Sequence, residues 1–365
     1  MSDPQKKQSA LEKEAREESA EKEHGVLYIG VDLGTSRASV HASNGVRDTV
    51  FSYVGYPKDV VSRKALKKEV LFGQEALDNR LSLEFFRPLE KGEIKGAGET
   101  GSAEGDRNLK AAKDLINHVI NLCEARRDEL IYAVIGVPAQ ASIHNEKAIV
   151  DASRELVDSV MLCSEPFAVA YGLDKLTDVL VIDIGAGTVD LCRMHGTMPE
   201  EADQITLYTA GDWLDQEIYR EFEQTCTDAD FTVNMVRTVK EKYGFVGDAV
   251  DPVEVEFPVE GKPTTFDVTE PLRTACKRIV PPIVEALHRL IASFDPEFQE
   301  RLRRNVLLAG GGSQIRSLDV EIERQMKEKL GGGQVFRIAD PMYAGAGGAL
   351  KIAHDMPEEY WQKLH

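Results

Sequence analysis

The chain has 365 residues, of which 42% are hydrophobic, so it is long enough for roughly two domains with full cores. Its 44 Lys and Arg residues against 62 Asp and Glu residues give a net charge of −18, which argues against nucleic acid or an anionic membrane as the main partner. No apolar run approaches the roughly 20 residues of a membrane-spanning helix, and the five cysteines are scattered singly, without a CxxC pair that would indicate a zinc site.

Residues 1–24 differ in composition from the rest of the chain. They contain seven acidic and five basic residues and little apolar side chain beyond Leu11. Such a segment cannot bury enough apolar surface to offset the entropy lost on ordering, so we expect a mobile tail or a frayed helix. It also lacks the apolar face that a membrane-anchoring helix needs.

From Val26 onward the sequence alternates between strand and helix patterns. The strands predicted in the first half lie at 26–33, 37–44 and 130–138, the last being apolar enough for burial on both faces. The helices predicted there lie at 108–127 and 145–157, and toward the ends of 69–80 and 159–173. The glycine-rich residues 91–105 predict a loop.

A similar pattern restarts near residue 178. Predicted strands lie at 178–185, 188–196 and 204–211, a helix lies at 213–224, and a later strand within 305–315 ends in glycines. Helices at 318–330 and 344–356 follow. Alternating strands and helices imply α/β layers, and the like beginnings of the two halves indicate an internally duplicated pair of domains.

The two halves share a turn with unusual chemistry. In each, a buried strand ends in an aspartate followed by glycine and hydroxyl residues, as "DLGTS" from Asp32 and "DIGAGT" from Asp183. Glycine lets the backbone approach an anion closely, and successive N–H groups form a nest for phosphate oxygens. An ordinary β-turn explains one such stretch but not two at matched positions. The residues expected to bind phosphate are Gly34, Thr35, Ser36, Gly185, Ala186, Gly187 and Thr188.

The aspartates at the strand ends raise an electrostatic problem. A carboxylate next to a phosphate nest is repulsive unless a cation lies between them. Asp32 and Asp183 are therefore expected to hold Mg²⁺ through its waters, because this ion dehydrates reluctantly.

Two further features lie outside the paired turns. "LLAGGGSQIRSL", from Leu307, places three glycines between a strand and a helix, where a flat group could lie against the backbone. Alone it is a tight loop with Ser313 as a cap, but beside two phosphate turns it favours an adenosine site. Glu165 begins a helix, where an acid suits the helix dipole. It could equally face the cleft and orient or deprotonate the water that attacks a γ-phosphate.

Other nucleotide-binding folds fit poorly. The sequence has no GxxxxGK[ST], which excludes a P-loop, and no GxGxxG that opens a helix after a strand, which disfavours a dinucleotide-binding fold.

These stretches, in this order, resemble the motifs of the superfamily of actin, sugar kinases and heat-shock chaperone ATPases. "IGVDLGTS" and "VIDIGAGTVDLC" are similar to its two phosphate motifs, "LLAGGGSQI" to its adenosine motif, and "PLEKGEIKG" and "YAGAGGALKIA" to its connecting segments. The resemblance spans about residues 26–355 and is closest to the bacterial actins, in particular the magnetosome-associated ones, through "SEPFAVAYGLDKL" and "DVTEPLRTACK".

The resemblance implies an actin-like α/β fold of two duplicated ribonuclease-H-like domains, with four subdomains around a nucleotide cleft. Domain I would comprise residues 25–177 and a C-terminal return at 336–365, with subdomain IB at about 45–108. Domain II would comprise residues 178–335, with subdomain IIB at about 213–290.

The resemblance also implies roles for single residues. Glu165 and Asp183 would be catalytic, Glu165 by polarising the attacking water, and Asp32 and Asp183 would hold Mg²⁺ through water. The adenosine side would be bound by Gly211, Asp212, Glu241, Gly310, Gly311, Gly312 and Ser313. Arg37 stands near the place of a phosphate-touching lysine of eukaryotic actin, but the sequence favours a solvated hairpin arginine there.

The function that the resemblance implies is ATP-driven assembly into cytoplasmic filaments, with ATP or ADP and Mg²⁺ as cofactors. The main partner would be the chain itself, with possible adaptor proteins on magnetosome membranes and filaments along the magnetosome chain. Nucleic acid and direct membrane insertion are not expected.

Several alternatives share the same fold. A small-molecule kinase would need a catalytic base beside an acceptor hydroxyl, and no residue must be one. A chaperone-type ATPase would need a peptide-binding domain, but only about ten residues follow the last motif. A non-hydrolysing scaffold is disfavoured by the presence of Asp32, Glu165 and Asp183. A shape-determining bacterial actin is the nearest rival, and often carries an apolar membrane-binding segment that this sequence does not show.

Overall fold

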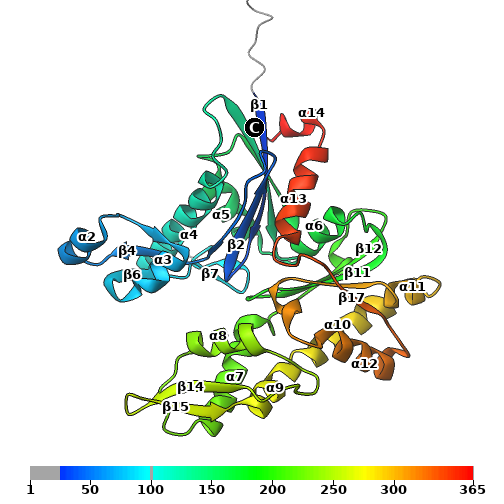
Figure 1. Ribbon diagram of the computed structural model, residues 1–365. Helices are drawn as coiled ribbons and strands as arrows, with labels where there is room; N and C mark the ends of the chain where they lie inside the picture. Colours follow the sequence, from blue (N-terminus) through cyan, green and yellow to red (C-terminus); the bar gives the residue numbers. More distant parts are fainter. Residues whose placement is uncertain (1–24, 99–101, 365) are drawn as a thin grey trace, which may run out of the picture.

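The computed structural model describes residues 25–98 and 102–364 (Figure 1). The predicted mobile segment 1–24 lies outside the described residues. None of the described helices is both long and apolar enough to cross a bilayer.

The first half is built on a five-stranded sheet in the order β10-β9-β1-β2-β3. Its strands are β1 (Gly25–Leu33), β2 (Arg37–Ala42), β3 (Arg47–Phe51), β9 (Glu129–Val137) and β10 (Ser159–Ser164). β1 pairs antiparallel with β2 and parallel with β9. The last six residues of β9 are buried, as its continuous apolar run predicts for a strand covered on both faces.

The second half repeats this arrangement in the order β13-β12-β11-β16-β17. Its strands are β11 (Thr177–Ile184), β12 (Val189–His195), β13 (Gln204–Leu207), β16 (Val306–Ala309) and β17 (Val335–Arg337). β11 takes the place of β1, since it pairs antiparallel with β12 and parallel with β16. The two sheets therefore share one topology, and each aspartate of the paired turns stands at the end of the equivalent strand.

Helices cover both sheets. Those of the first half are α4 (Ala103–Asn121), α5 (Ile143–Ser153) and α6 (Glu165–Gly172). In the second half α10 (Val280–Ala292), α11 (Gln299–Arg303) and α12 (Leu318–Leu330) contact the sheet, whereas α7 (Gly211–Thr225), α8 (Val233–Tyr243) and α9 (Thr269–Lys277) pack together farther from it (Figure 1). The chain then returns as α13 (Ala344–Asp355) and α14 (Glu358–Trp361) to lie beside β1 (Figure 1).

α13 packs unusually close to its neighbours because glycines remove the side chains between them. A Cβ on Gly348 would lie 1.8 Å from the carbonyl oxygen of Ala168 in α6, and a Cβ on Gly30 of β1 would lie 2.1 Å from the carbonyl oxygen of Ala346. These backbones can approach only because neither position carries a side chain. The returning helix is thereby fixed against both β1 and α6.

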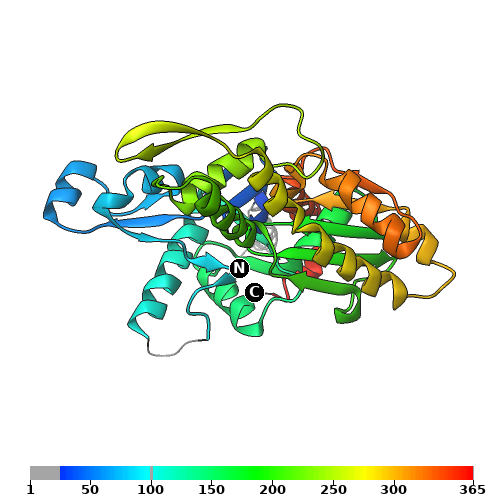
Figure 2. The ribbon, with the colours of Figure 1, turned by 90° about the horizontal axis from the view of Figure 1, so that it is seen from below.

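Two small sheets extend from the main body at the same end of the molecule (Figures 1 and 2). In the first half, β4 (Val54–Pro57) pairs with β5 (Leu71–Phe72) and β6 (Leu83–Phe86), flanked by α2 (Val60–Leu66) and α3 (Gly73–Asp78). β7 (Leu89–Glu90) and β8 (Glu93–Ile94) follow as a short pair. In the second half the hairpin β14 (Glu254–Val259) and β15 (Lys262–Asp267) was not predicted from periodicity. The domain boundaries proposed from sequence stay a prediction.

The start of α4 differs from the sequence expectation. α4 begins at Ala103, within the predicted loop 91–105, because the Ser102 side chain accepts a hydrogen bond from the Gly105 N–H and caps the helix. Gly96 packs against this first turn, where a Cβ on Gly96 would lie 2.6 Å from the Cα of Gly105. The described residues 91–98 are turns with the short strand β8, so the loop prediction is wrong only at its C-terminal end, where α4 begins.

Candidate active site

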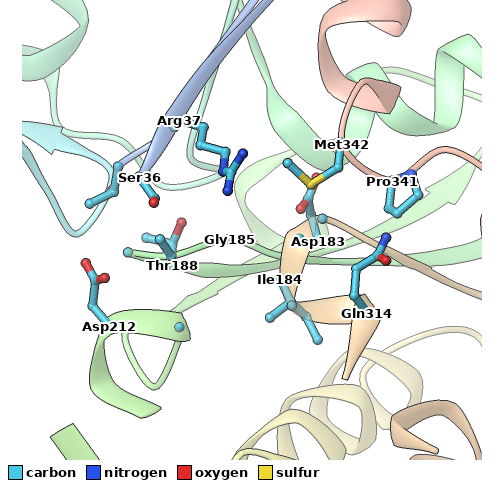
Figure 3. A pocket seen from close by; sticks show the side chains of 18 of the residues that line it. Ser36, Arg37, Asp183, Ile184, Gly185, Thr188, Asp212, Gln314, Pro341 and Met342 are labelled. Carbon is cyan, nitrogen blue, oxygen red and sulfur yellow. The ribbon is translucent and has the colours of Figure 1, made fainter. Parts of the chain in front are cut away.

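A cavity of about 390 Å³ lies between the two sheets, where the paired turns face each other (Figure 3). Every residue that the sequence assigns to the site lines this cavity except Ser313. These lining residues are Asp32, Gly34, Thr35, Ser36, Glu165, Asp183, Gly185, Ala186, Gly187, Thr188, Gly211, Asp212, Glu241, Gly310, Gly311 and Gly312. Ser313 is fully buried behind the wall, where its hydroxyl donates a 2.7 Å hydrogen bond to the Gly310 carbonyl oxygen and supports the loop.

The two turns approach each other closely. A Cβ on Gly187 would lie 2.3 Å from the Thr35 hydroxyl oxygen and 2.8 Å from the Gly92 nitrogen. Thr35 in turn accepts a 2.9 Å hydrogen bond from the Gly92 N–H. Glycine at 187 is thus a steric requirement of this arrangement, which brings one glycine turn from each half to the same cavity.

Four carboxylates influence one another here: Asp32 and Asp183 near the ends of β1 and β11, Asp190 near the start of β12, and Glu165 at the start of α6. Burial raises the pKa of Asp32 to about 6. Burial also raises the pKa values of Glu165 and Asp183 well above their usual range, and the charges of Asp32 and Asp190 raise both further. The pKa of Asp190 is raised by burial as well, although hydrogen bonds from Thr206, Thr188 and Ala139 oppose the shift. A nearby cation would relieve the mutual repulsion of these carboxylates.

The chemistry of these donors fits Mg²⁺ held mainly by water and phosphate. Within residues 25–98 and 102–364, no group of three or more His, Cys, Asp or Glu side chains is arranged to hold a metal by itself. Asp183 is buried and Asp32 is half-buried, and the charge of Asp32 raises the pKa of Asp183. A divalent cation near both would relieve that repulsion, and Mg²⁺ characteristically uses one or two carboxylates together with ligand phosphates.

The third glycine stretch forms the far wall of the cavity. Gly310 has φ +75°, and a Cβ there would lie 2.3 Å from Asp183 Oδ1, so only glycine fits this turn. Apolar side chains missed by sequence reasoning also line the cavity, among them Ile279 and Ile315. Ile184, Pro341 and Met342 are seen in Figure 3. An apolar wall beside exposed backbone suits a flat base. Single apolar residues at a strand end and in separate loops carry no sequence signal of such a role.

Basic side chains line the cavity on the side of Asp212. Arg37 is not the solvated hairpin arginine that the sequence favours: its guanidinium carbon lies 4.1 Å from the centre of the Phe51 ring, and its Nη2 lies 3.6 Å from Glu241 across the cavity. Arg237 and Lys240 of α8 also line the cavity and were missed. Their spacing of three residues places both on one face of a helix, which is the signal that could have found them.

The chain is similar to known bacterial actin-like proteins over nearly its whole length. Residues 27–357 match the family described as MreB/Mbl protein. The actin-like protein MamK of Paramagnetospirillum magneticum strain AMB-1 is 38% identical over 338 residues, which cover 93% of this chain and 95% of the relative.

Solved structures agree with this relationship. The subunit of a MamK double helical filament superposes with a TM-score of 0.86 at 38% identity, over 91% of this chain and all of that chain. A non-polymerising MamK mutant bound to AMPPNP has the same identity and coverage and a TM-score of 0.69. The expected actin-like fold, with its duplicated halves around a cleft, is therefore confirmed.

Proposed function

Because this chain belongs to the MreB/Mbl family of bacterial actin-like proteins, we propose that it binds Mg-ATP in the cavity, assembles into filaments and hydrolyses the nucleotide to drive their turnover. The observation that carries this proposal is the meeting of two glycine turns, one from each half, in a single cavity beside buried carboxylates. A ligand gripped from both halves would fix the angle between them.

The turns and the third glycine stretch would divide the ligand between them. Backbone N–H groups at 34–36 and 185–188 would bind the phosphates, while the apolar wall at Ile315 and Met342 would cover the base. When bound, Mg²⁺ would neutralise charge on the phosphates, with Asp32 and Asp183 as its holders.

Glu165 would act on water at the phosphate end. It begins α6, is half-buried and lines the cavity, which supports this role. A carboxylate there would accept a hydrogen bond from the attacking water and orient it. Hydrolysis would remove the bridge between the halves and weaken subunit contacts.

Assembly into filaments follows from the kind of contact that such subunits make. Identical subunits joined head to tail use two different surfaces at each contact. Such contacts build an open filament unless the rotation from one subunit to the next closes them into a ring. The similarity to the subunit of the MamK double helical filament supports this mode of assembly. By the same relationship we propose a cytoskeletal location along the magnetosome chain, with adaptor proteins on magnetosome membranes as further partners.

Electron microscopy of the purified chain with Mg-ATP, combined with a phosphate-release assay, tests the proposal. We expect filaments with Mg-ATP, none without nucleotide, and phosphate release in the absence of any acceptor molecule. Phosphate release that requires an added acceptor would favour a small-molecule kinase. Absence of nucleotide binding by calorimetry would refute the proposed function.

A further inference from the structure

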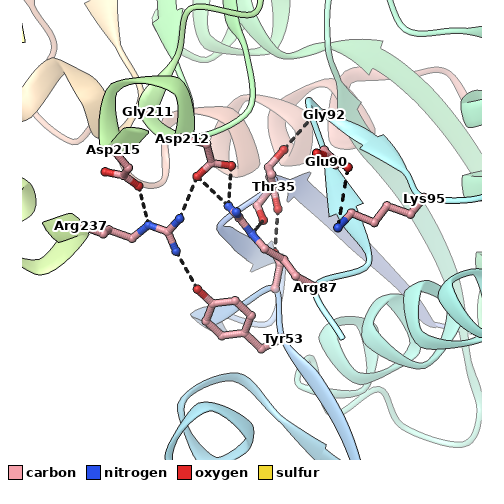
Figure 4. Close-up of polar contacts among 12 residues, drawn as sticks. Thr35, Tyr53, Arg87, Glu90, Gly92, Lys95, Gly211, Asp212, Asp215 and Arg237 are labelled. Carbon is pink, nitrogen blue, oxygen red and sulfur yellow. Dashed lines mark hydrogen bonds and ion pairs between the residues drawn. The ribbon is translucent and has the colours of Figure 1, made fainter. Parts of the chain in front are cut away.

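Arg87 joins the first phosphate turn to the second half of the molecule (Figure 4). It lies between β6 and β7, and its Nε donates a 3.3 Å hydrogen bond to the Thr35 carbonyl oxygen. Its Nη2 lies 2.9 and 2.8 Å from the two carboxylate oxygens of Asp212, in the first turn of α7. One guanidinium thus bonds to a residue on each wall of the cavity. The ammonium of a lysine is a point charge without the planar fork of a guanidinium, so it would not make both bonds with this geometry.

Arg237 makes the second connection across the cavity. Its Nη1 donates a 2.9 Å hydrogen bond to the Tyr53 hydroxyl, which belongs to the first half, and its Nη2 lies 3.0 Å from Asp212 (Figure 4). The fully buried carboxylate of Asp215 accepts a 2.8 Å hydrogen bond from its Nε, and Lys240 lies 2.6 Å from the same carboxylate. This anchoring inside the second half orients the guanidinium toward Tyr53.

These contacts differ in what happens to them if the two halves separate. The pair of Arg237 with Asp212 lies within the second half and would persist. The contacts of Arg87 with Asp212 and of Arg237 with Tyr53 cross the cavity and would be lost. The side chains of Arg87, Asp212 and Arg237 are only 23%, 27% and 14% exposed, so these pairs are shielded from solvent screening better than surface pairs. The third crossing pair, Arg37 with Glu241, is longer and more exposed.

We propose that Tyr53, Arg87, Asp212 and Arg237 form a clamp, the Asp212 clamp, in which the two arginines are positioning residues that hold the halves together over the bound nucleotide. This inference rests on the proposed function, since it assigns a control of nucleotide release to the same cavity. Opening of the clamp would be required before a ligand gripped by both halves could leave.

The clamp can be tested without nucleotide by measuring the distance between the halves. All five native cysteines are buried, so spin labels can be directed to Val61→Cys on α2 and Lys262→Cys on β15, which stand at the same end of the molecule on opposite sides of the cavity. In this labelled chain, we expect Arg87→Met to lengthen and broaden the distance distribution. An unchanged distribution would overturn the clamp.

Release of a fluorescent ATP analogue in the presence of Mg²⁺ provides the second measurement. Arg87→Met should release it roughly tenfold faster. The lost ion pair of Arg87 with Asp212 is partly buried, so we expect it to be stronger than an exposed pair and weaker than a fully buried one. Arg87→Lys should recover only part of the effect, because an ammonium cannot reach both Thr35 and Asp212 in the same fork. Tyr53→Phe, which keeps the ring and removes only the hydroxyl, should release it roughly threefold faster.

Arg63→Met provides the matched control, since it removes one positive charge from an exposed position of α2. It should leave both the distance and the release rate as in the wild type. Wild-type release rates in Arg87→Met would overturn the clamp. Failure of the wild type to bind the analogue would instead overturn the proposed function, while the distance measurement would still decide whether the clamp exists.

Discussion

The backbone amide of Ala139 donates a 2.9 Å hydrogen bond to the Asp190 carboxylate, and this bond joins the two halves of the chain beside the cavity. Asp190 lies on β12 directly opposite Asp183 in the pairing of β11 with β12, while Ala139 follows β9 of the first half. The same carboxylate accepts a 2.6 Å hydrogen bond from the Thr206 hydroxyl. Asp190 is only 1% exposed, so it serves as a buried acceptor that ties the sheets together.

Replacement of Asp190 should therefore destabilise the fold, and the loss should be larger when the new side chain has fewer oxygen atoms to accept these hydrogen bonds. Asp190→Ala leaves the Ala139 amide and the Thr206 hydroxyl without their partner, and should lower the free energy of unfolding by about 1–3 kcal/mol. Asp190→Asn keeps one acceptor oxygen and should cost less. Denaturant unfolding measures both, with Asp251→Ala at an exposed position as the control. An equal loss in all three variants would contradict the assigned role.

The close contact of α13 with α6 predicts opposite effects for two adjacent glycines. A Cβ on Gly348 would meet the Ala168 carbonyl oxygen at 1.8 Å, whereas a Cβ on Gly347 would meet only His41 Nδ1, at 3.5 Å. Gly348→Ala should lower the free energy of unfolding by about 1–3 kcal/mol through overpacking. Gly347→Ala should be neutral or stabilising by up to about 1 kcal/mol, because alanine has the higher helix propensity. Thermal unfolding of the two variants side by side decides the point.

The features readable from sequence are those in which local chemistry repeats. The turns after Asp32 and Asp183 share one pattern, and the equivalent strands β1 and β11 place them in the same cavity. The glycines at 310–312 can also be read from sequence, although they occur once. A strand that ends in glycines before a helix predicts a tight loop with exposed backbone. The structure adds the physical reason, since Gly187 and Gly310 stand where a Cβ would collide with neighbouring atoms.

The features that could not be read depend on contacts between distant segments. Arg87 and Tyr53 sit in short connecting segments without periodicity, and their partners Asp212 and Arg237 lie more than 100 positions away. The apolar side chains of Pro341 and Met342 gain meaning only from the cavity that folding creates. Arg37 was misjudged because its partners Phe51 and Glu241 come from other elements.

A buried ion pair in the second half gives the fold a pH dependence at the acidic end. Burial would raise the pKa of Asp203, but hydrogen bonds from the Glu200 amide, Arg193 and His195 outweigh this and lower it below its ordinary value of 3.8. Since the folded pKa is the lower one, the ionised carboxylate stabilises the fold above the ordinary pKa, and this stabilisation is lost as the pH falls toward the folded pKa. Arg193 and Asp203 are each 6% exposed as side chains.

Asp203→Asn tests this dependence directly. At pH 5–8 the variant leaves Arg193 buried without its counter-charge and should be less stable than the wild type by about 3–5 kcal/mol. The difference should shrink as the pH falls below about 4, because the wild-type carboxyl is then protonated as well. Denaturant unfolding at a series of pH values gives the difference. A difference that stays constant down to pH 3 would contradict the lowered pKa.

The proposed Mg²⁺ holders predict a specific loss in nucleotide affinity. For the wild type, removal of Mg²⁺ with EDTA should weaken ATP binding, because Asp32 and Asp183 then repel the phosphates. Asp183→Asn should depend on Mg²⁺ less than the wild type does, because only Asp32 then remains to hold the ion and to repel the phosphates. Calorimetric titrations under both conditions measure this ratio. A variant that keeps the wild-type dependence on Mg²⁺ would show that the ion is held elsewhere.

Glu165 is predicted to govern hydrolysis without governing assembly. Its carboxylate lines the cavity at the start of α6, and its removal leaves both phosphate turns in place. Glu165→Ala should therefore slow phosphate release by roughly 100-fold or more while filaments still form, so that they become long-lived.

Glu165→Gln keeps the volume and one acceptor oxygen, and a partial rate in this variant would separate the orientation of water from proton acceptance. Pelleting with Mg-ATP, a phosphate assay and Glu223→Gln as an exposed control on α7 complete the test. Wild-type hydrolysis in Glu165→Ala would assign the attacking water to another residue.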